Sequence, residues 1–210
     1  MDIKTWVTSN LKTSSIVVEA GTSYGCDTRF FSDYLSNGKV YGFEPIPELY
    51  RLASQRTNGQ PNVELSNKAL SSHTGVGTIY VSDRFGEPAE SSSLLKPKNH
   101  LTIHPEITFK KSIKIETINL DDWFNSKNIA MIDLMWLDLQ GYEPIVLQHA
   151  PVTLSKTRYL YTEVSLVETY DGVLQYPEFK AFLLNNDFEI VFESLPYADM
   201  GDVLFKNKTL

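Results

Sequence analysis

The segment Met131–Leu139 constrains the fold more than any other part of the chain, because it is the most apolar run of strand length in the sequence. Such a run is typical of a strand that is buried on both faces at the centre of a parallel sheet. Further strand-like runs, rich in β-branched and aromatic residues, occur at residues 16–18, 39–43, 63–65, 77–81, 113–118, 159–164, 188–192 and 202–205. We therefore expect a sheet with Met131–Leu139 near its centre.

Helical patterns alternate with these strands. Apolar residues recur at helical spacing in residues 27–35, and Pro47 suits the first turn of a helix that follows the strand at 39–43. Further helices are expected at 120–124, 143–149 and 177–184. The alternation predicts an α/β fold in which helices cover a mostly parallel sheet. A chain of 210 residues is about one and a half times a usual domain, so we expect a single domain over residues 1–210.

Residues 82–111 interrupt this alternation. They contain three prolines and three consecutive serines, and they show no convincing period of either helix or strand. A connection of this length inside a compact domain is commonly a functional lid or an insertion. We therefore expect residues 82–111 to form a lid or insertion without regular structure.

Charge and cysteine content limit the partners. Lysine and arginine total 19 against 26 aspartates and glutamates, and a net charge of −7 repels nucleic-acid phosphates and anionic lipid. A small-molecule partner is expected rather than nucleic acid or a membrane. Cys26 is the single cysteine, which excludes an intrachain disulfide and a cysteine-rich zinc site. No secretory signal pattern and no run of about 20 apolar residues is found, so we expect a cytoplasmic location.

Polar side chains follow several of the predicted strands. Glu19, Glu44, Asn67, Asp138 and Glu163 each stand at or just beyond the carboxyl end of a strand, and these ends meet at one edge of an open α/β sheet. A single acid at such a position commonly only caps the next helix. Four acids at one edge favour a ligand site.

The first of these loops distinguishes between cofactors. A dinucleotide fingerprint that starts at Gly21 requires glycine at positions 23 and 26, where the chain has Ser23 and Cys26. Glu44, at the end of the next strand, is placed to accept both hydroxyls of a ribose. A ribose-bearing cofactor without a pyrophosphate and with a positive centre near Glu19 fits S-adenosylmethionine. Two alternatives remain: a nicotinamide-dependent Rossmann oxidoreductase or epimerase, and a catalytically inactive nucleotide-binding module.

Six sequence blocks support the first interpretation. They are Val17–Gly25, Val40–Pro45, Asn67–Ser71, Ser91–Leu94, Leu120–Asp122 and Trp136–Glu143. In order and spacing they resemble the successive motifs of the FkbM family of S-adenosylmethionine-dependent O-methyltransferases, over about residues 15 to 192. The chain departs from the family pattern twice. Glu19-Ala20-Gly21-Thr22-Ser23 stands where the family usually has Asp-x-Gly-Ala-Asn, and Gln140 stands where an acid is common.

The resemblance implies a Rossmann-like class I methyltransferase fold, with a seven-stranded mostly parallel sheet, an antiparallel last strand and helices on both faces. It also implies methyl transfer to a hydroxyl of a sugar, glycan or polyketide-like acceptor. The expected cofactor contacts are Glu19, Gly21, Thr22, Ser23, Tyr24 and Gly25 at the amino-acid end, Glu44 and Pro45 at the ribose, Asn67, Lys68 and Ala69 near the adenine, and Ser92 and Asp138 elsewhere in the site.

Methyl transfer to an alcohol needs either a base for the hydroxyl proton or a metal bound to the oxygen. Asp138 is placed for both roles, and Glu163 completes an oxygen-ligand site for Mg²⁺ if the metal alternative holds. His100 and His104 are four residues apart, but Pro105 argues against a continuing helix that would pair them as zinc ligands. His104 is instead a candidate acid or base in the acceptor pocket.

Overall fold

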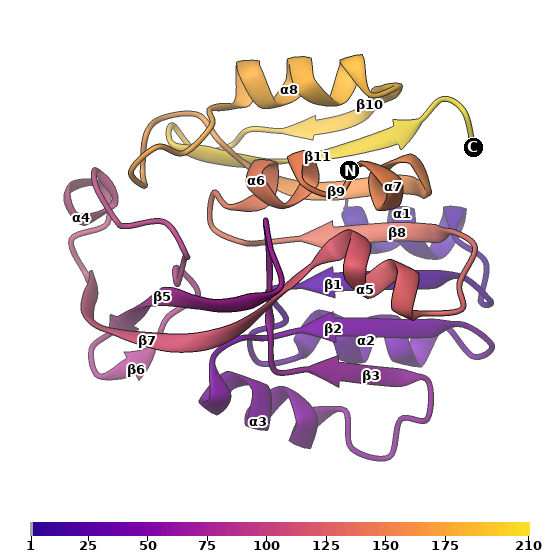
Figure 1. Cartoon of the computed structure of the whole chain (residues 1–210), viewed down its shortest axis with the longest axis horizontal. Helices are drawn as coiled ribbons and strands as arrows, with labels where there is room; N and C mark the ends of the chain where they lie inside the picture. Colours follow the sequence, from indigo (N-terminus) through magenta and orange to yellow (C-terminus); the bar gives the residue numbers. More distant parts are fainter. Residues whose placement is uncertain (1) are drawn as a thin grey trace.

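The computed structural model describes residues 2–210, and its main sheet has seven strands (Figure 1). In spatial order they are β10 (Phe188–Ser194), β11 (Met200–Asn207), β9 (Thr157–Ser165), β8 (Ile132–Leu137), β1 (Ile16–Ala20), β2 (Lys39–Phe43) and β3 (Val63–Ser66). The strands from β9 to β3 pair in parallel, while β11 runs antiparallel to both β9 and β10. The predicted fold class, with an antiparallel last strand, is confirmed.

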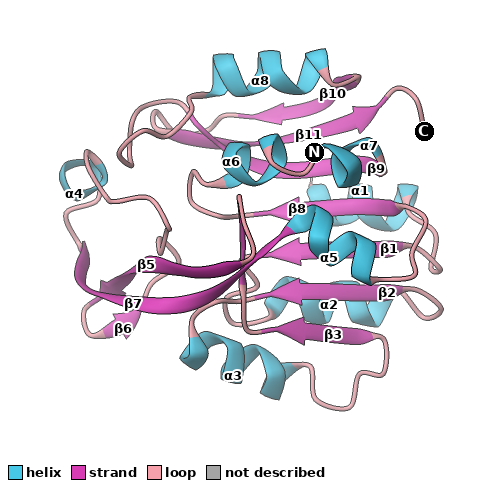
Figure 2. Cartoon of the chain, in the orientation of Figure 1, coloured by secondary structure: helices cyan, strands magenta, loops and turns pink. Residues whose placement is uncertain are grey.

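Helices cover both faces of this sheet (Figure 2). They are α1 (Ile3–Asn10), α2 (Cys26–Tyr34), α3 (Pro47–Arg56), α5 (Leu120–Ser126), α6 (Glu143–Gln148), α7 (Pro151–Ser155) and α8 (Tyr176–Asn185). The apolar side chains of α1 and α2 pack with one face, and those of α5 to α8 pack with the other. No helix within residues 2–210 is long and apolar enough to cross a membrane.

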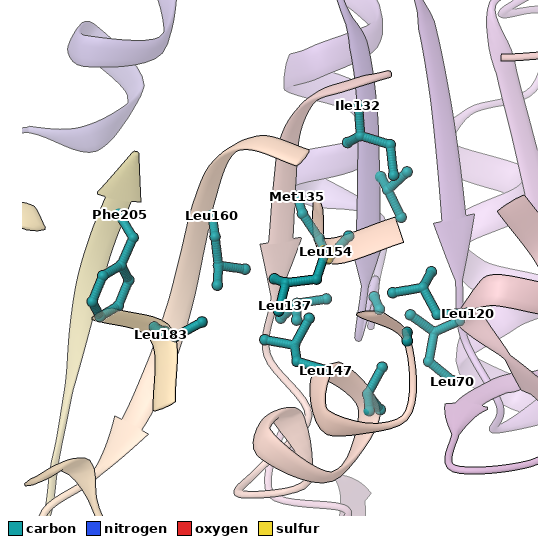
Figure 3. Packing of buried hydrophobic residues seen from close by; sticks show 14 of the residues in the cluster. Leu70, Leu120, Ile132, Met135, Leu137, Leu147, Leu154, Leu160, Leu183 and Phe205 are labelled. Carbon is teal, nitrogen blue, oxygen red and sulfur yellow. The ribbon is translucent and has the colours of Figure 1, made fainter. Parts of the chain in front are cut away.

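The central strand β8 shows why this sheet forms. Its side chains alternate between the two helical layers. Leu134 and Trp136 join the layer of α1 and α2. Met135 and Leu137 join the other layer, in the cluster that Figure 3 shows. All four are buried, as expected for a strand whose residues are apolar on both faces. This packing fixes the carboxyl end of β8 beside the ends of β1 and β9.

A second sheet extends from the carboxyl edge of the first (Figure 1). Its strands are β4 (Ala69–Ser71), β7 (Ile107–Asn119), β5 (Gly75–Arg84) and β6 (Glu87–Pro88). The expectation that the strands at 77–81 and 113–118 belong to the mostly parallel sheet is therefore wrong, because β5 and β7 pair antiparallel with each other. A period of two identifies a strand but not its partner.

Residues 82–111 also contain more regular structure than the sequence indicates. They include the end of β5, all of β6, the short helix α4 (His100–Ile103) and the start of β7. The expectation of an irregular segment is wrong. The reason is that the long antiparallel pair of β5 and β7 extends away from the main core, so several of its side chains, such as Lys110 and Lys111, are exposed and the apolar alternation is lost.

Candidate active site

A cavity of about 230 Å³ lies where β1, β2 and β8 end and where the second sheet begins. Its walls come from the loop after β1, the turn after β2, residues 68–70, the inner side of β5 and the segment that follows β8. Ligands of open α/β sheets bind at this edge. The cavity is the candidate cofactor site.

Glu19, the fourth residue of β1, brings a carboxyl group to the cavity. Its side chain is 2% exposed, and the oxygen Oε2 has no hydrogen-bond partner within residues 2–210. Burial raises the pKa of Glu19 to about 8, because the buried site disfavours the charged carboxylate. The hydroxyl of Thr22, which also lines the cavity, is likewise buried without a partner there. Glu19 and Thr22 thus each have a buried polar atom that can bond to a ligand.

Glu44 follows β2 and is held by two backbone amides. Ser23 N donates to Oε2 at 2.8 Å, and Ile46 N donates to Oε1 at 2.9 Å. Burial raises the pKa of Glu44 to about 7, against the effect of these two bonds. The Asn67 side chain donates to the Glu44 carbonyl at 2.7 Å and so fixes the turn from behind. Each carboxylate oxygen of Glu44 keeps a second lone pair for a ligand.

Two glycines make this arrangement possible. Gly21 has a φ of +86°, and a Cβ there would lie 2.0 Å from the carbonyl oxygen of Asp138, so only glycine lets the β1 loop approach the end of β8. Gly25 has a φ of +75°, and a Cβ there would lie 2.9 Å from Ala53 Cα. Gly25 therefore allows α2 to pack against α3, and it does not line the cavity.

Asp138 comes directly after β8, and its side chain is exposed to the cavity that it lines. Its backbone N–H donates to Ala20 O at 3.0 Å, which fixes it beside β1. The Gln140 amide donates to Oδ1 of Asp138 at 2.7 Å. The surrounding protein raises the pKa of Asp138 to about 6, and Gln140 opposes that rise. The pKa of the Asp138 carboxyl group therefore lies above that of an ordinary aspartate.

Three carboxyl groups gather at the side of the cavity that Asp138 lines. Asp138, Glu143 in the first turn of α6 and Glu163 on β9 each offer an oxygen within 4.8 Å of the other two. Burial and the like charges raise the pKa of Glu143 to about 8 and that of Glu163 well above its ordinary value. Gln140 Nε2 also donates to Glu163 Oε2, at 3.2 Å. The amide therefore lies between two of the three acids.

His104 follows α4, where its Nε2 lies 2.7 Å from Oδ2 of Asp199. His100 is 1% exposed, and its ring packs against those of His104 and Tyr170. Neither histidine lines the cavity.

The structure brings most of the predicted cofactor residues together. Those that line the cavity are Glu19, Gly21, Thr22, Ser23, Tyr24, Glu44, Pro45, Lys68, Ala69, Ser92 and Asp138. Gly25, Asn67, Glu163 and His104 do not line it. Their functional roles, and those of the lining residues, remain predictions. The sequence analysis missed Asp27 and Glu143, whose positions in the first turns of α2 and α6, just beyond strand ends, were the available signal.

The chemistry of the lining fits S-adenosylmethionine. Among the described residues that line the cavity, Lys68 is the single basic side chain, whereas five are acidic: Glu19, Asp27, Glu44, Glu90 and Asp138. An anionic pyrophosphate is repelled by such a lining. A cationic ligand with a ribose matches both the unpartnered Glu19 oxygen and the backbone-held Glu44.

Comparisons with known proteins agree with this assignment. A model of the methyltransferase FkbM domain matches residues 19–190. The chain is 33% identical over 203 residues to the 2-O-methyltransferase NoeI of Sinorhizobium fredii, with 95% of this chain and 82% of that protein covered.

Solved structures show the same fold at low identity. The fibrillarin pre-rRNA processing protein of Methanococcus jannaschii has a TM-score of 0.58 at 14% identity, covering 94% of this chain and 68% of that one. The Aeropyrum pernix fibrillarin with bound S-adenosylmethionine has a TM-score of 0.54 at 12% identity, covering 93% and 68%. The family match favours the methyltransferase interpretation over the nicotinamide-dependent and inactive alternatives. The chain belongs to the FkbM family of S-adenosylmethionine-dependent O-methyltransferases, as the six sequence blocks predict.

Proposed function

We propose that this methyltransferase acts on a sugar hydroxyl and that Asp138 accepts the hydroxyl proton. The observation that carries the proposal is the position of Asp138: it lines the cofactor cavity on one side and joins Gln140 and Glu163 on the other. The name of NoeI, a 2-O-methyltransferase, supports an oxygen as the methyl acceptor.

This proposal gives a separate role to each of three acids, Glu19, Glu44 and Asp138. When bound, S-adenosylmethionine supplies a methyl group on a positively charged sulfur. Glu19 is placed to bind the cationic amino-acid end, and Glu44 to bind the ribose hydroxyls. Asp138 takes the acceptor proton as the oxygen–methyl bond forms and the sulfur–methyl bond breaks. The electron pair of the broken sulfur–methyl bond stays on sulfur. A base with a pKa of about 6 is ionised at neutral pH yet basic enough to assist.

A Mg²⁺ ion held by Asp138 and Glu163 is the second candidate, and the gathering of three carboxyl groups favours it. The Gln140 amide opposes it, because its NH₂ group donates to Asp138 Oδ1 and Glu163 Oε2 and so places positively polarised hydrogens, which repel a cation, between these two acids. We therefore propose direct proton transfer. Activity that survives a chelator supports direct transfer; activity that is lost with chelator and restored by Mg²⁺ supports the metal.

The acceptor class is testable with labelled methyl groups. Purified protein is incubated with S-adenosylmethionine that carries a tritiated methyl group, together with methyl glycosides of hexoses and deoxyhexoses, a polyketide-type alcohol, or ribosomal RNA. The proposal expects label in the glycosides, and the net charge of −7 opposes RNA binding. Label only in the polyketide-type alcohol or in the RNA would overturn the sugar assignment.

The single cysteine is compatible with action in a reducing, cytoplasmic location.

Residues 82–111 are proposed as a lid within a single domain, despite their regular structure. Two hydrogen bonds support this role: Tyr24 donates to Pro88 O at 3.0 Å, and Ser23 donates to Glu90 at 3.1 Å. The loop after β1 is thereby bonded to this segment, which contributes Glu90 to the cavity lining. Limited proteolysis should cut the free protein first within residues 84–99, and S-adenosylmethionine should protect the site. Equal cleavage with and without the cofactor contradicts the lid.

A further inference from the structure

Gln140 is the most completely bonded side chain near the proposed base. It is 7% exposed and has a φ of +54°, a strained conformation for a residue other than glycine. Its amide nitrogen donates to Asp138 Oδ1 at 2.7 Å and to Glu163 Oε2 at 3.2 Å. Its amide oxygen lies 3.2 Å from the hydroxyl of Tyr170. Every polar atom of this side chain is therefore used.

Tyr170 fixes which way the amide points. The tyrosine is 2% exposed, and its hydroxyl is shared between Gln140 Oε1 and the carbonyl of Ser91, which lies 2.7 Å away. Because the ionised carboxylate of Asp138 can only accept, the Gln140 nitrogen faces Asp138, and the Gln140 oxygen faces Tyr170, whose hydroxyl can donate to it.

The backbone of Gln140 is held separately from its side chain. Ser93 Oγ donates to the Gln140 carbonyl at 2.9 Å, in a buried contact that any residue at position 140 can accept. Anchoring of this turn therefore does not require the amide. The amide contacts only the two carboxylates and Tyr170, so its contribution is to the acids.

We propose that Gln140, oriented by Tyr170, is a positioning residue that holds Asp138 and Glu163 together so that Asp138 presents Oδ2 to the acceptor. No group in residues 2–210 donates to Oδ2, whereas Oδ1 is occupied by the amide. The bond from Gln140 thus leaves Oδ2, one of two otherwise equivalent oxygens, as the proton-accepting atom and fixes the direction of Oδ2. This inference rests on the proposed role of Asp138 as the base.

The test uses Gln140→Asn, because asparagine tolerates a positive φ but is one methylene too short to reach both acids. We expect kcat to fall about tenfold or more, as is usual when a reacting group is misplaced by about 1 Å, with KM for the glycoside and the Kd of S-adenosylmethionine within about twofold of wild type. Tyr170→Phe, which leaves the glutamine in place, should give a smaller loss of the same kind. The control Gln175→Asn, at an exposed position before α8, should change nothing.

A double-mutant cycle separates positioning from a structural role. If Gln140 acts through Asp138, then adding Gln140→Asn to Asp138→Asn should cost no further activity. An equal loss in both backgrounds, or normal kcat in Gln140→Asn, overturns the inference. Full activity of Asp138→Asn alone instead overturns the proposed function. Crystal structures give a readout that needs no acceptor. The Asp138 carboxylate should turn or become disordered in Gln140→Asn. An unchanged carboxylate contradicts the positioning role of Gln140.

Discussion

An aspartate lies near each end of β8, and the two differ in how many of their carboxylate oxygens have a bonding partner. At the amino end, Asp133 Oδ2 accepts from Ile16 N at 2.9 Å and Oδ1 lies 3.3 Å from Arg158, so both oxygens are partnered. At the carboxyl end, Asp138 has a partner on Oδ1 alone and lies among other acids. The same strand therefore ends in a satisfied structural carboxylate on one side and in an incompletely bonded one on the other.

This difference shows where the chain keeps groups for a ligand. The interior of β8 and its Asp133 end contribute burial and paired charges to folding. The carboxyl edge instead gathers Glu19, Glu44 and Asp138, whose pKa values are all raised by burial. Such groups favour folding less than paired acids do, and a bound cation or hydrogen-bond donor satisfies them.

The largest expected effect is on the carboxyl edge. Glu44→Ala removes two hydrogen-bond acceptors for the ribose, which should cost about 2–4 kcal/mol and raise the Kd of S-adenosylmethionine by about thirtyfold to several hundredfold. Titration calorimetry measures the change. Glu48→Ala, at an exposed position in the first turn of α3, is the matched control and should bind normally. Unchanged affinity in Glu44→Ala would remove the ribose assignment.

A smaller effect is expected from pH. The pKa of Glu19 is raised to about 8 in the free protein, so a cationic ligand must displace a proton when it binds. Affinity for S-adenosylmethionine should therefore fall as pH decreases from 7.5 to 6, by at most about tenfold per unit for each linked proton. Calorimetry in buffers of different ionisation heat should detect proton release, and Glu19→Gln should reduce it. Stronger binding at lower pH contradicts this sign.

The smallest effect is expected at the other end of β8. Asp133→Asn keeps an acceptor for Ile16 N but loses the ion pair with Arg158, which should lower the free energy of unfolding by about 1 kcal/mol. Turnover per folded molecule should remain that of the wild type. Denaturant unfolding and initial rates measure the two quantities. A large loss of turnover would show that the two ends of β8 are not separate in function.

Much of the main sheet was predictable because its strands are apolar on both faces. Met131–Leu139 indicated the central strand, and the structure places β8 at Ile132–Leu137. The acids at the strand ends were predictable for a similar reason, since parallel strands bring their carboxyl ends to one edge. Glu19, Glu44 and Asp138 all line the cavity as expected from their places in the sequence.

The second sheet and the bonds around Gln140 were not predictable. Residues 107–112 form the first half of β7 although they show little apolar alternation, because their partner is the adjacent strand β5 rather than a packed helix. Gln140 was visible only as a departure from the family pattern. Its contacts join Ser91, Asp138, Glu163 and Tyr170, which are far apart in sequence and meet only through the tertiary fold.

The central claim is that the carboxylate of Asp138 is the base for methyl transfer, and Asp138→Asn tests it most directly because it keeps the shape and removes the charge. Rates of methyl transfer to the best glycoside acceptor are measured together with the Kd of S-adenosylmethionine. We predict that kcat falls by about a hundredfold or more while the Kd changes little, as is usual for loss of a general base. An Asp138→Asn enzyme with the turnover of the wild type would contradict the account.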